Sequence, residues 1–266
     1  MTFRDSTEVG QISKPPYFWG PFNEFQPIKD RAFDSDYWLI HSKNIFNDLI
    51  SSKSNISVFF KFKTFLKVIT GFQIRKFLPH SLIKILKGGS SVLDIGGGWG
   101  DNYLKFHKYG LHFNDHQYAV LDNSEQCDLG RGFFSENQIS FYNHMPSKQF
   151  DIVFLIGTLQ YIEDWKSIFQ TFDKLGCKYV YIERTPFVSD CDTYCVVQSI
   201  TPSTIKFKIG EENLNIISDT DFYEACSEFG WKIDPFRSQR DYSANFIRMP
   251  KSHQKVFYQR YLLTKI

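Results

Sequence analysis

The chain has 266 residues, a formal net charge of +2 and five scattered cysteines. This length is enough for one large domain, or for one domain with an added cap, and the near-balanced charge excludes a general preference for polyanions. The cysteines are odd in number and form no Cys-x-x-Cys pair, so neither a disulfide framework nor a zinc site is indicated. The first residues lack the apolar core of a signal peptide and no apolar run reaches membrane-spanning length, so we expect a cytoplasmic protein.

Residues 1–89 are expected to form an N-terminal aromatic and helical cap. Tyr17, Phe18 and Trp19 form an aromatic cluster, and the stretch Asp34–Asp36 can cap a helix that begins with Tyr37. This segment either packs against the main domain or closes as a lid over cofactor and acceptor. In the second case we expect Tyr37 to contact the acceptor.

Residues 51–87 carry eight lysines and arginines and no acid, interleaved with phenylalanines. Two interpretations of this basic amphipathic stretch stay open. It is either a solvated basic face over a buried apolar face, or a surface that contacts an anionic membrane or a phosphate-bearing acceptor. Peripheral membrane contact is therefore an open possibility at this point.

The most informative stretch runs from Ser91 to Gly100. Val92–Ile95 have the composition of a short buried strand, the glycines that follow open a tight turn, and Asp101 can cap the next helix. A glycine turn lets a ligand approach the backbone closely, and the start of the helix offers N–H groups. The stretch therefore predicts a nucleotide-cofactor site.

The spacing of the glycines indicates which cofactor. Gly96 and Gly98 begin the dinucleotide fingerprint Gly-x-Gly-x-x-Gly, but its third position is Asp101. An acid that ends the strand, as Asp94 does, repels a pyrophosphate but suits the ammonium group of S-adenosylmethionine. The loop residues expected to bind S-adenosylmethionine are Asp94, Gly96, Gly97 and Gly98.

Beyond this loop, predicted strands alternate with predicted helices, which favours a mostly parallel, doubly wound α/β sheet over residues 90–266. The strands are expected at Tyr118–Leu121, Ile139–Tyr142, Phe150–Ile156 and Tyr179–Ile182. Such sheets bind ligands at the carboxyl ends of their strands. The further residues expected to bind the cofactor there are Asp122, Asn123, Asn143, Gly157, Thr158 and Leu159.

The last part of the chain is less regular. Residues 188–217 are expected to be an irregular insertion beside the acceptor. Ser218–Asp221 can begin a helix that Gly230 ends. Trp231–Ile233 and Tyr242–Ile247 are then expected to pair as the final strands of the sheet.

The run from about Ser91 to Arg248 resembles the class I S-adenosylmethionine-dependent methyltransferases, and among them a bacterial family often encoded in surface-polysaccharide clusters. The segments that carry this resemblance are Val92–Gly100, Gly157–Asp164, Glu183–Phe187 and Val197–Gln198. The resemblance implies a Rossmann-like methyltransferase sheet with helices on both faces and S-adenosylmethionine as cofactor. Two departures concern the acceptor: Asp122-Asn123 stands where the family has an acid and Gln, and a Tyr-Pro-aromatic stretch is absent around Lys206–Ile216.

The expected reaction is methyl transfer to a hydroxyl or phosphate-type oxygen of a small molecule or glycan, such as a sugar, a nucleotide-activated precursor or a capsule or lipopolysaccharide component. A hydroxyl needs a base, whereas an anionic phosphate oxygen does not. The candidate bases are His144, Tyr161 and Glu183. The candidate acceptor contacts are Tyr37, Gln160, Tyr161, Arg184 and Gln198, although Arg184 is equally explained as part of a salt-bridged strand end.

Three alternatives remain. A module that retains S-adenosylmethionine without turnover is suggested by the lack of an evident base. A nicotinamide oxidoreductase is disfavoured by the glycine spacing. Nucleic-acid methylation is disfavoured because Gly157-Thr158-Leu159-Gln160 stands where an Asn/Asp-Pro-Pro-Tyr motif is expected, and no side-chain spacing indicates a metal site.

Overall fold

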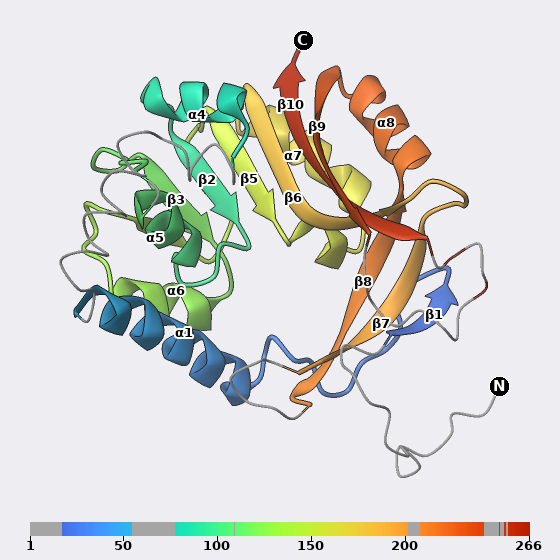
Figure 1. Cartoon of the computed structure of the whole chain (residues 1–266), viewed down its shortest axis with the longest axis horizontal. Helices are drawn as coiled ribbons and strands as arrows, with labels where there is room; N and C mark the ends of the chain where they lie inside the picture. The colour runs from blue at the N-terminus through green and yellow to red at the C-terminus, as the bar shows by residue number, and fades with distance from the viewer. Residues whose placement is uncertain are drawn as a thin grey trace.

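The protein is described by a computed structural model over residues 18–54, 78–108, 110–201, 208–241, 250, 253 and 255–266. Its centre is a mixed sheet of ten strands within these ranges. Five neighbouring strands are parallel, in the order β4 (Ser140–Tyr142), β3 (Tyr118–Leu121), β2 (Val92–Ile95), β5 (Ile152–Ile156) and β6 (Tyr179–Val188). Antiparallel β10 (Val256–Lys265) follows β6, and β9 (Trp231–Asp241) follows β10 (Figure 1).

Helices cover both faces of this sheet, as the alternation of buried side chains requires. Leu93 and Val153 belong to the cluster beneath α7 (Ile168–Lys174) and α8 (Asp219–Glu228). The neighbouring strand residues Val92, Ile152 and Phe154 belong to a second cluster on the opposite face. That cluster includes residues of α4 (His80–Lys87), α5 (Asp101–Lys108) and α6 (Ser124–Arg131). The expected Rossmann-like, doubly wound class is therefore confirmed.

The prediction of an irregular insertion over residues 188–217 is wrong. β7 (Tyr194–Ile200) and β8 (Gly210–Ser218) form a regular antiparallel pair, and β1 (Phe18–Phe22) adds to the outer side of β7. Alternate residues of the pair bury an apolar face that includes Val196, Leu214 and Ile216. In β8, Asn213 and Asn215 alternate with these apolar residues and conceal the strand from a search for continuous apolar runs.

The expected final pair of strands is also corrected. β9 begins at Trp231 as predicted, but it pairs with β10 near the end of the chain, and residues 242–249 lie outside the described ranges. Most of the basic stretch, residues 55–77, lies outside them too, as does Tyr17. The division into a cap over 1–89 and a main domain over 90–266 stays a prediction.

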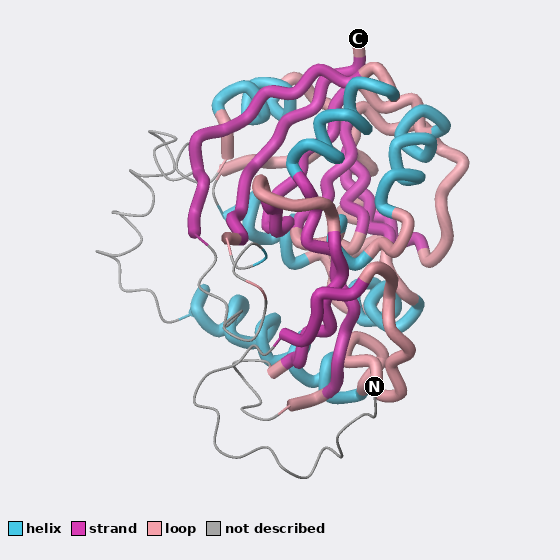
Figure 2. Tube along the Cα trace, turned by 90° about the vertical axis from the view of Figure 1, so that its right-hand side faces the viewer, coloured by secondary structure: helices cyan, strands magenta, loops and turns pink. Residues whose placement is uncertain are grey.

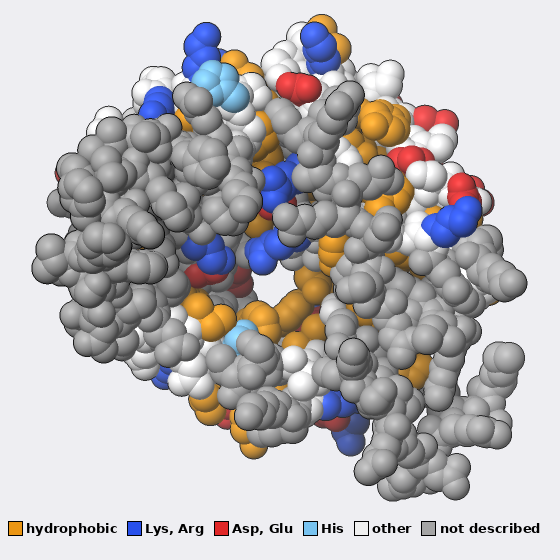
Figure 3. All heavy atoms as spheres, viewed as in Figure 1, with side chains coloured by type: hydrophobic (Ala, Val, Ile, Leu, Met, Phe, Trp, Pro, Cys, Tyr) orange, Lys and Arg blue, Asp and Glu red, His pale blue; other side chains and the backbone are white. Residues whose placement is uncertain are grey.

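Helix α1 (Asp36–Ser54) begins where the sequence predicts, and the backbone N–H of Trp38 donates to the hydroxyl of Ser35 at its start. The two ribbon views place α1 opposite the carboxyl ends of the parallel strands (Figures 1 and 2). The surface is deeply hollowed between them, and basic, acidic and apolar side chains surround the hollow (Figure 3). None of the helices in the described ranges is long and apolar enough to cross a membrane.

Candidate cofactor and acceptor site

The glycine loop after β2 has a backbone that only glycine adopts easily. Gly96, Gly98 and Gly100 have φ angles of +70°, +58° and +95°. A Cβ atom at Gly96 would lie 2.3 Å from the hydroxyl oxygen of Thr158, and one at Gly97 would lie 2.6 Å from a carboxylate oxygen of Asp94. The loop is thus wedged between the end of β5 and the side chain of Asp94.

Asp94 lies fully buried beneath the glycine loop. Its Oδ2 accepts hydrogen bonds from the Tyr118 hydroxyl at 2.7 Å and from Asn102 Nδ2 at 3.1 Å, whereas Oδ1 has no partner. Burial raises the pKa of Asp94 to about 7, an effect that the two hydrogen bonds oppose. The side chain is therefore covered by the loop and does not line an open cavity wall.

Asp122, at the end of β3, joins the glycine loop from the other side. Its Oδ2 accepts the backbone N–H of Gly98 at 2.8 Å, and its Oδ1 accepts that of Asn123 at 2.8 Å. Burial raises the pKa of Asp122, and the two backbone N–H groups oppose this shift. The Asn123 side chain caps α6 by accepting the backbone N–H of Gln126 at 2.9 Å. The carboxylate of Asp122 and the glycine loop are therefore brought together as predicted.

Gln126 is a polar residue of this site that the sequence analysis missed. It is buried on the first turn of α6, where its Oε1 accepts a hydrogen bond from the Ser42 hydroxyl of α1 at 3.4 Å. Its Nε2 has no partner. A Cβ atom at Gly98 would have the Oε1 of Gln126 as its nearest neighbour, at 3.8 Å. The available signal was its position four residues after Asp122, which points it back toward the glycine loop.

Two of the three buried side-chain atoms that lack a hydrogen-bond partner in the described ranges flank this loop: Asp94 Oδ1 and Gln126 Nε2. Buried polar atoms are nearly always paired in folded proteins. One of these atoms is an acceptor and the other a donor. The site is therefore suited to a ligand that carries both a positive group and a hydrogen-bond acceptor.

Asn143 and His144 lie farther out, after the edge strand β4. Asn143 Nδ2 donates to the Ser124 hydroxyl at 3.4 Å, and a ring nitrogen of His144 lies 2.9 Å from Asn143 Oδ1. Both side chains are exposed. This placement connects them with the start of α6, on the same side as Asp122.

The segment after β5 gathers several predicted acceptor residues. Gly157, with a φ of +76°, leads into a short 3₁₀ helix, η1 (Leu159–Tyr161). Within it Leu159 is buried, and Gln160 accepts a hydrogen bond from Thr185 at 3.3 Å. The Tyr161 hydroxyl donates to Gln198 Oε1 at 3.1 Å. Tyr37 is instead 49% exposed on α1.

A bulge interrupts β6 at Glu183 and Arg184. Gln259 pairs with Thr185 and Tyr261 with Ile182, so Arg260 alone stands opposite these two residues. Arg184 has a φ of +59°, a conformation that costs a residue with a side chain about 1–2 kcal/mol. Its Nη2 donates to the carbonyl oxygen of Ile156 at 3.0 Å. The bulge thus turns the Arg184 side chain toward the end of β5.

Glu183 is engaged within the protein. Its Oε1 lies 2.9 Å from Arg260 Nη2, and its Oε2 accepts the Tyr181 hydroxyl at 2.8 Å. The pKa of Tyr181 is strongly raised, chiefly by burial and further by the Glu183 charge. A carboxylate that accepts from both neighbours in this way is held in place.

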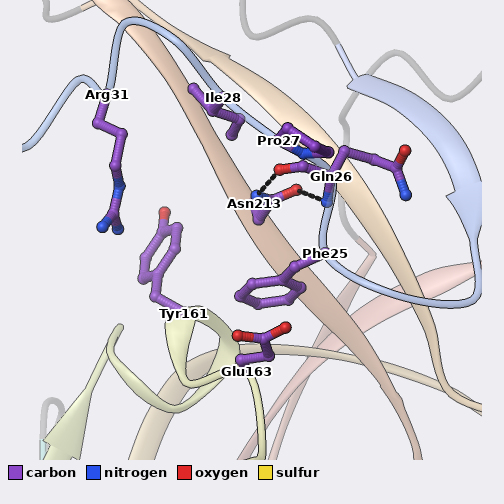
Figure 4. Close-up of a pocket in the computed structure, with 8 residues that line it drawn as sticks. All are labelled: Phe25, Gln26, Pro27, Ile28, Arg31, Tyr161, Glu163 and Asn213. Atoms are coloured by element: carbon purple, nitrogen blue, oxygen red, sulfur yellow. Dashed lines mark hydrogen bonds between the residues drawn. The ribbon is translucent and has the colours of Figure 1, made fainter.

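A pocket of about 490 Å³ lies between the N-terminal segment, the η1 region and β8 (Figure 4). Its lining residues are Phe25, Gln26, Pro27, Ile28, Arg31, Tyr161, Glu163 and Asn213. Asn213 fixes the N-terminal segment by accepting the backbone N–H of Gln26 at 2.9 Å and donating to its carbonyl oxygen at 2.7 Å. The Arg31 guanidinium points toward the Tyr161 hydroxyl end in Figure 4 and forms an ion pair with buried Glu212 at 3.2 Å.

His41, on α1, is a second residue that the sequence analysis missed. Its ring lies 5.2 Å from that of Trp38, and partial burial lowers its pKa. It precedes Ser42, the residue that joins α1 to Gln126. A neutral imidazole on this helix is a candidate proton acceptor that only the fold reveals.

No protein-family model and no curated protein sequence matches the chain. Among solved structures, the N-terminal domain of EvdMO1, determined in the presence of SAH and D-fucose, is similar at 11% identity over 74% of this chain and 82% of that chain, with a TM-score of 0.48. An S-adenosylmethionine-dependent methyltransferase from Clostridium acetobutylicum ATCC 824 is similar at 13% identity over 86% and 99%, with a TM-score of 0.47.

The Burkholderia thailandensis 1,6-didemethyltoxoflavin-N1-methyltransferase, solved with 1,6-didemethyltoxoflavin and S-adenosylhomocysteine, is similar at 11% identity over 96% of this chain and 97% of that chain, with a TM-score of 0.46. Identities and TM-scores this low assign neither an activity nor a substrate to this chain.

Proposed function

We propose that the protein is an S-adenosylmethionine-dependent methyltransferase that acts on an oxygen of a small molecule or glycan. The observation that carries the proposal is the glycine loop held between Asp94 and Asp122, with an unpaired buried acceptor and an unpaired buried donor beside it. When bound, S-adenosylmethionine supplies a methyl group on a positively charged sulfur.

The residues present fit this cofactor. The carboxylate of Asp122 suits the ribose hydroxyls. These hydroxyls would donate to the remaining lone pairs of its oxygens while Gly98 keeps its hydrogen bond. The buried charge of Asp94 favours a cation above the loop, and the free donor of Gln126 suits a carboxylate or a ring nitrogen. Asn143 and the segment Gly157–Leu159 would border the rest of the cofactor.

The pocket of Figure 4 and the neighbouring η1 helix are the proposed acceptor side. Tyr161 belongs to both. Gln160 precedes it in η1, the Tyr161 hydroxyl donates to Gln198, and Arg184 lies beside Gly157 at the start of the same segment. Tyr37 is the proposed contact from α1. Holding an acceptor oxygen in line with the methyl group contributes to the rate by positioning, which can lower a barrier by about 7–11 kcal/mol.

The proposed acceptor is a sugar, a nucleotide-activated precursor or a component of a surface polysaccharide. The pocket supports this class because it combines the apolar surfaces of Phe25, Pro27 and Ile28 with the polar groups of Arg31 and Glu163. Proton removal from an acceptor hydroxyl by His144, Tyr161 or Glu183 stays a prediction.

Calorimetric titration with S-adenosylhomocysteine tests the cofactor. We expect micromolar binding, weakened at least tenfold in Asp122→Asn, because the variant loses a charged acceptor beside the loop. Asp115→Asn is the matched control, since Asp115 is exposed in the turn that precedes the same strand. Absence of S-adenosylhomocysteine binding, or saturable NAD binding instead, contradicts the proposal.

Turnover is tested separately by the release of S-adenosylhomocysteine from S-adenosylmethionine in the presence of nucleotide sugars and free sugars. Methyl transfer to any of them supports an enzyme. Tight cofactor binding with no methyl transfer to a broad acceptor panel supports a non-catalytic binding module.

A further inference from the structure

We infer that the acceptor presents an oxyanion, a carboxylate or a phosphate, to Arg184, and that this oxygen takes the methyl group without a general base. The inference rests on the proposed function and names its substrate class. Three features of the structure carry it: the placement of Arg184, its charge, and the engagement of the predicted bases.

The bulge in β6 places the Arg184 guanidinium at the carboxyl end of β5. Nη2 reaches the carbonyl oxygen of Ile156 at 3.0 Å. A Cβ atom at Gly157 would lie 3.4 Å from both Nε and Nη2 of Arg184, so the missing side chain of Gly157 leaves room beside the guanidinium. Thr158, next in the chain, contacts the glycine loop at Gly96. The guanidinium and the loop are therefore two neighbouring parts of one edge.

The ion pairing of Arg184 differs from that of the other arginines around the site. Arg260 is paired with Glu183 and Arg31 with Glu212. Within the described ranges, no carboxylate lies within salt-bridge distance of Arg184. A strained, left-handed backbone that presents an exposed guanidinium at a ligand edge is typical of a functional position. Its planar fork of N–H donors matches a carboxylate or a phosphate.

The three predicted bases already have hydrogen-bond partners, and His41, the further candidate on α1, is the rival base that the glucose probe tests. Both Glu183 oxygens have partners, the Tyr161 hydroxyl donates to Gln198, and His144 is exposed beside Asn143. An oxyanion removes the need for a base because its lone pair is already available. The acceptor oxygen forms the new C–O bond as the methyl C–S bond breaks, and the electron pair of that bond goes to sulfur. No proton is transferred in this step.

Titrations of inorganic phosphate and acetate into the full-length chain saturated with S-adenosylhomocysteine test the anion site. We expect at least one of them to bind at millimolar concentration and to bind at least tenfold more weakly to Arg184→Gly. Glycine adopts the required φ without strain, so we expect this variant to melt at the same temperature as the wild type or higher. Lys178→Ala, which removes an exposed positive charge at the start of the same strand, should leave anion binding unchanged.

Equal anion affinity in wild type and Arg184→Gly overturns the inference. Failure of S-adenosylhomocysteine to bind overturns the proposed function instead. The two failures are distinguishable because a parallel titration measures anion binding by Arg184 without cofactor.

The chemistry of the methylated product separates the two anion sources. Glucuronate, glucose 6-phosphate and glucose serve as matched acceptor probes with labelled S-adenosylmethionine. A carboxyl methyl ester releases methanol in mild alkali, whereas a methyl phosphate resists both alkali and phosphatase. Either product, lost in Arg184→Gly, supports the inference. An ether formed on glucose, and lost in His41→Ala, contradicts it.

Discussion

The proposed cofactor side and the proposed acceptor side of this protein are built differently. On the cofactor side, the glycine loop, Asp94, Asp122 and Gln126 come from one short stretch of chain, and two of their buried polar atoms lack partners. On the acceptor side, Arg31 pairs with Glu212, and Gln26 with Asn213, across 181 and 187 residues. Glu212 and Asn213 are paired within the protein.

This contrast indicates where a ligand is needed to complete the structure. Unpaired buried groups on the cofactor side are satisfied only when something binds, whereas the acceptor side is held together by the protein itself. On the cofactor side, the effect of a substitution on ligand affinity should therefore be independent of its effect on the free energy of unfolding. Substitutions in the Arg31–Glu212 and Gln26–Asn213 pairs should change stability without changing the affinity for the cofactor.

The largest effect is expected for Gly96→Ala. Its Cβ would collide with Thr158 and its φ of +70° is unfavourable for alanine, so we expect a loss of about 2–4 kcal/mol in the free energy of unfolding. Gly98→Ala meets only atoms at 3.8 Å or beyond and should cost clearly less. Urea unfolding of both variants measures the difference. Equal losses would contradict the close contact between the loop and Thr158.

The second effect concerns pH. The pKa of Asp94 is raised by burial from 3.8 to about 7, so its protonated form favours the folded state, and this contribution is lost as the pH rises from about 4 to 7. The isosteric Asp94→Asn stays neutral throughout. We expect the stability of the variant relative to the wild type to rise by roughly 2–4 kcal/mol between pH 4 and pH 8. Melting temperatures over that range check it, and a constant difference would refute the raised pKa.

A smaller effect is expected on the acceptor side. Arg31→Ala leaves buried Glu212 with the backbone N–H of Phe33, which should cost about 1–2 kcal/mol of stability because Arg31 itself is half exposed. The affinity for S-adenosylhomocysteine should stay unchanged. Lys255→Ala, which removes an exposed ion pair with Asp190, is the control and should leave stability unchanged. Weaker cofactor binding in Arg31→Ala would erase the distinction between the two sides.

The smallest effect on stability, and the sharpest test of the contrast, is expected for Gln126→Met. The substitution removes a buried donor that has no partner, at the loss of one long hydrogen bond from Ser42. We expect stability to change by less than about 1 kcal/mol while the affinity for S-adenosylhomocysteine falls at least fivefold. Unchanged affinity would mean that Gln126 does not contact the cofactor.

The sequence was sufficient for the parallel half of the sheet. β2, β3 and β5 fall where the apolar runs predict them, because strands buried on both faces carry a continuous signal. β8 was missed because polar residues alternate with apolar ones along residues 213–216. The pairing of β9 with β10 was missed because the sequence between them, residues 242–255, contains no glycine and no other short-range hairpin signal.

The residues of the candidate site also fall into those that the sequence named and those that only the structure revealed. Asp94, Asp122 and the glycines were named from the sequence because they lie at the ends of strands or directly after them, and parallel strands bring their carboxyl ends together. The burial of Gln126 against Ser42 of α1 and the bulge that turns Arg184 toward Ile156 of β5 depend on contacts between segments distant along the chain. Local sequence fixes which residues end each strand, because that follows from hydrophobic period and glycine spacing. Burial, hydrogen-bond partners and pKa shifts arise only when those ends meet, so the tertiary structure alone decided them.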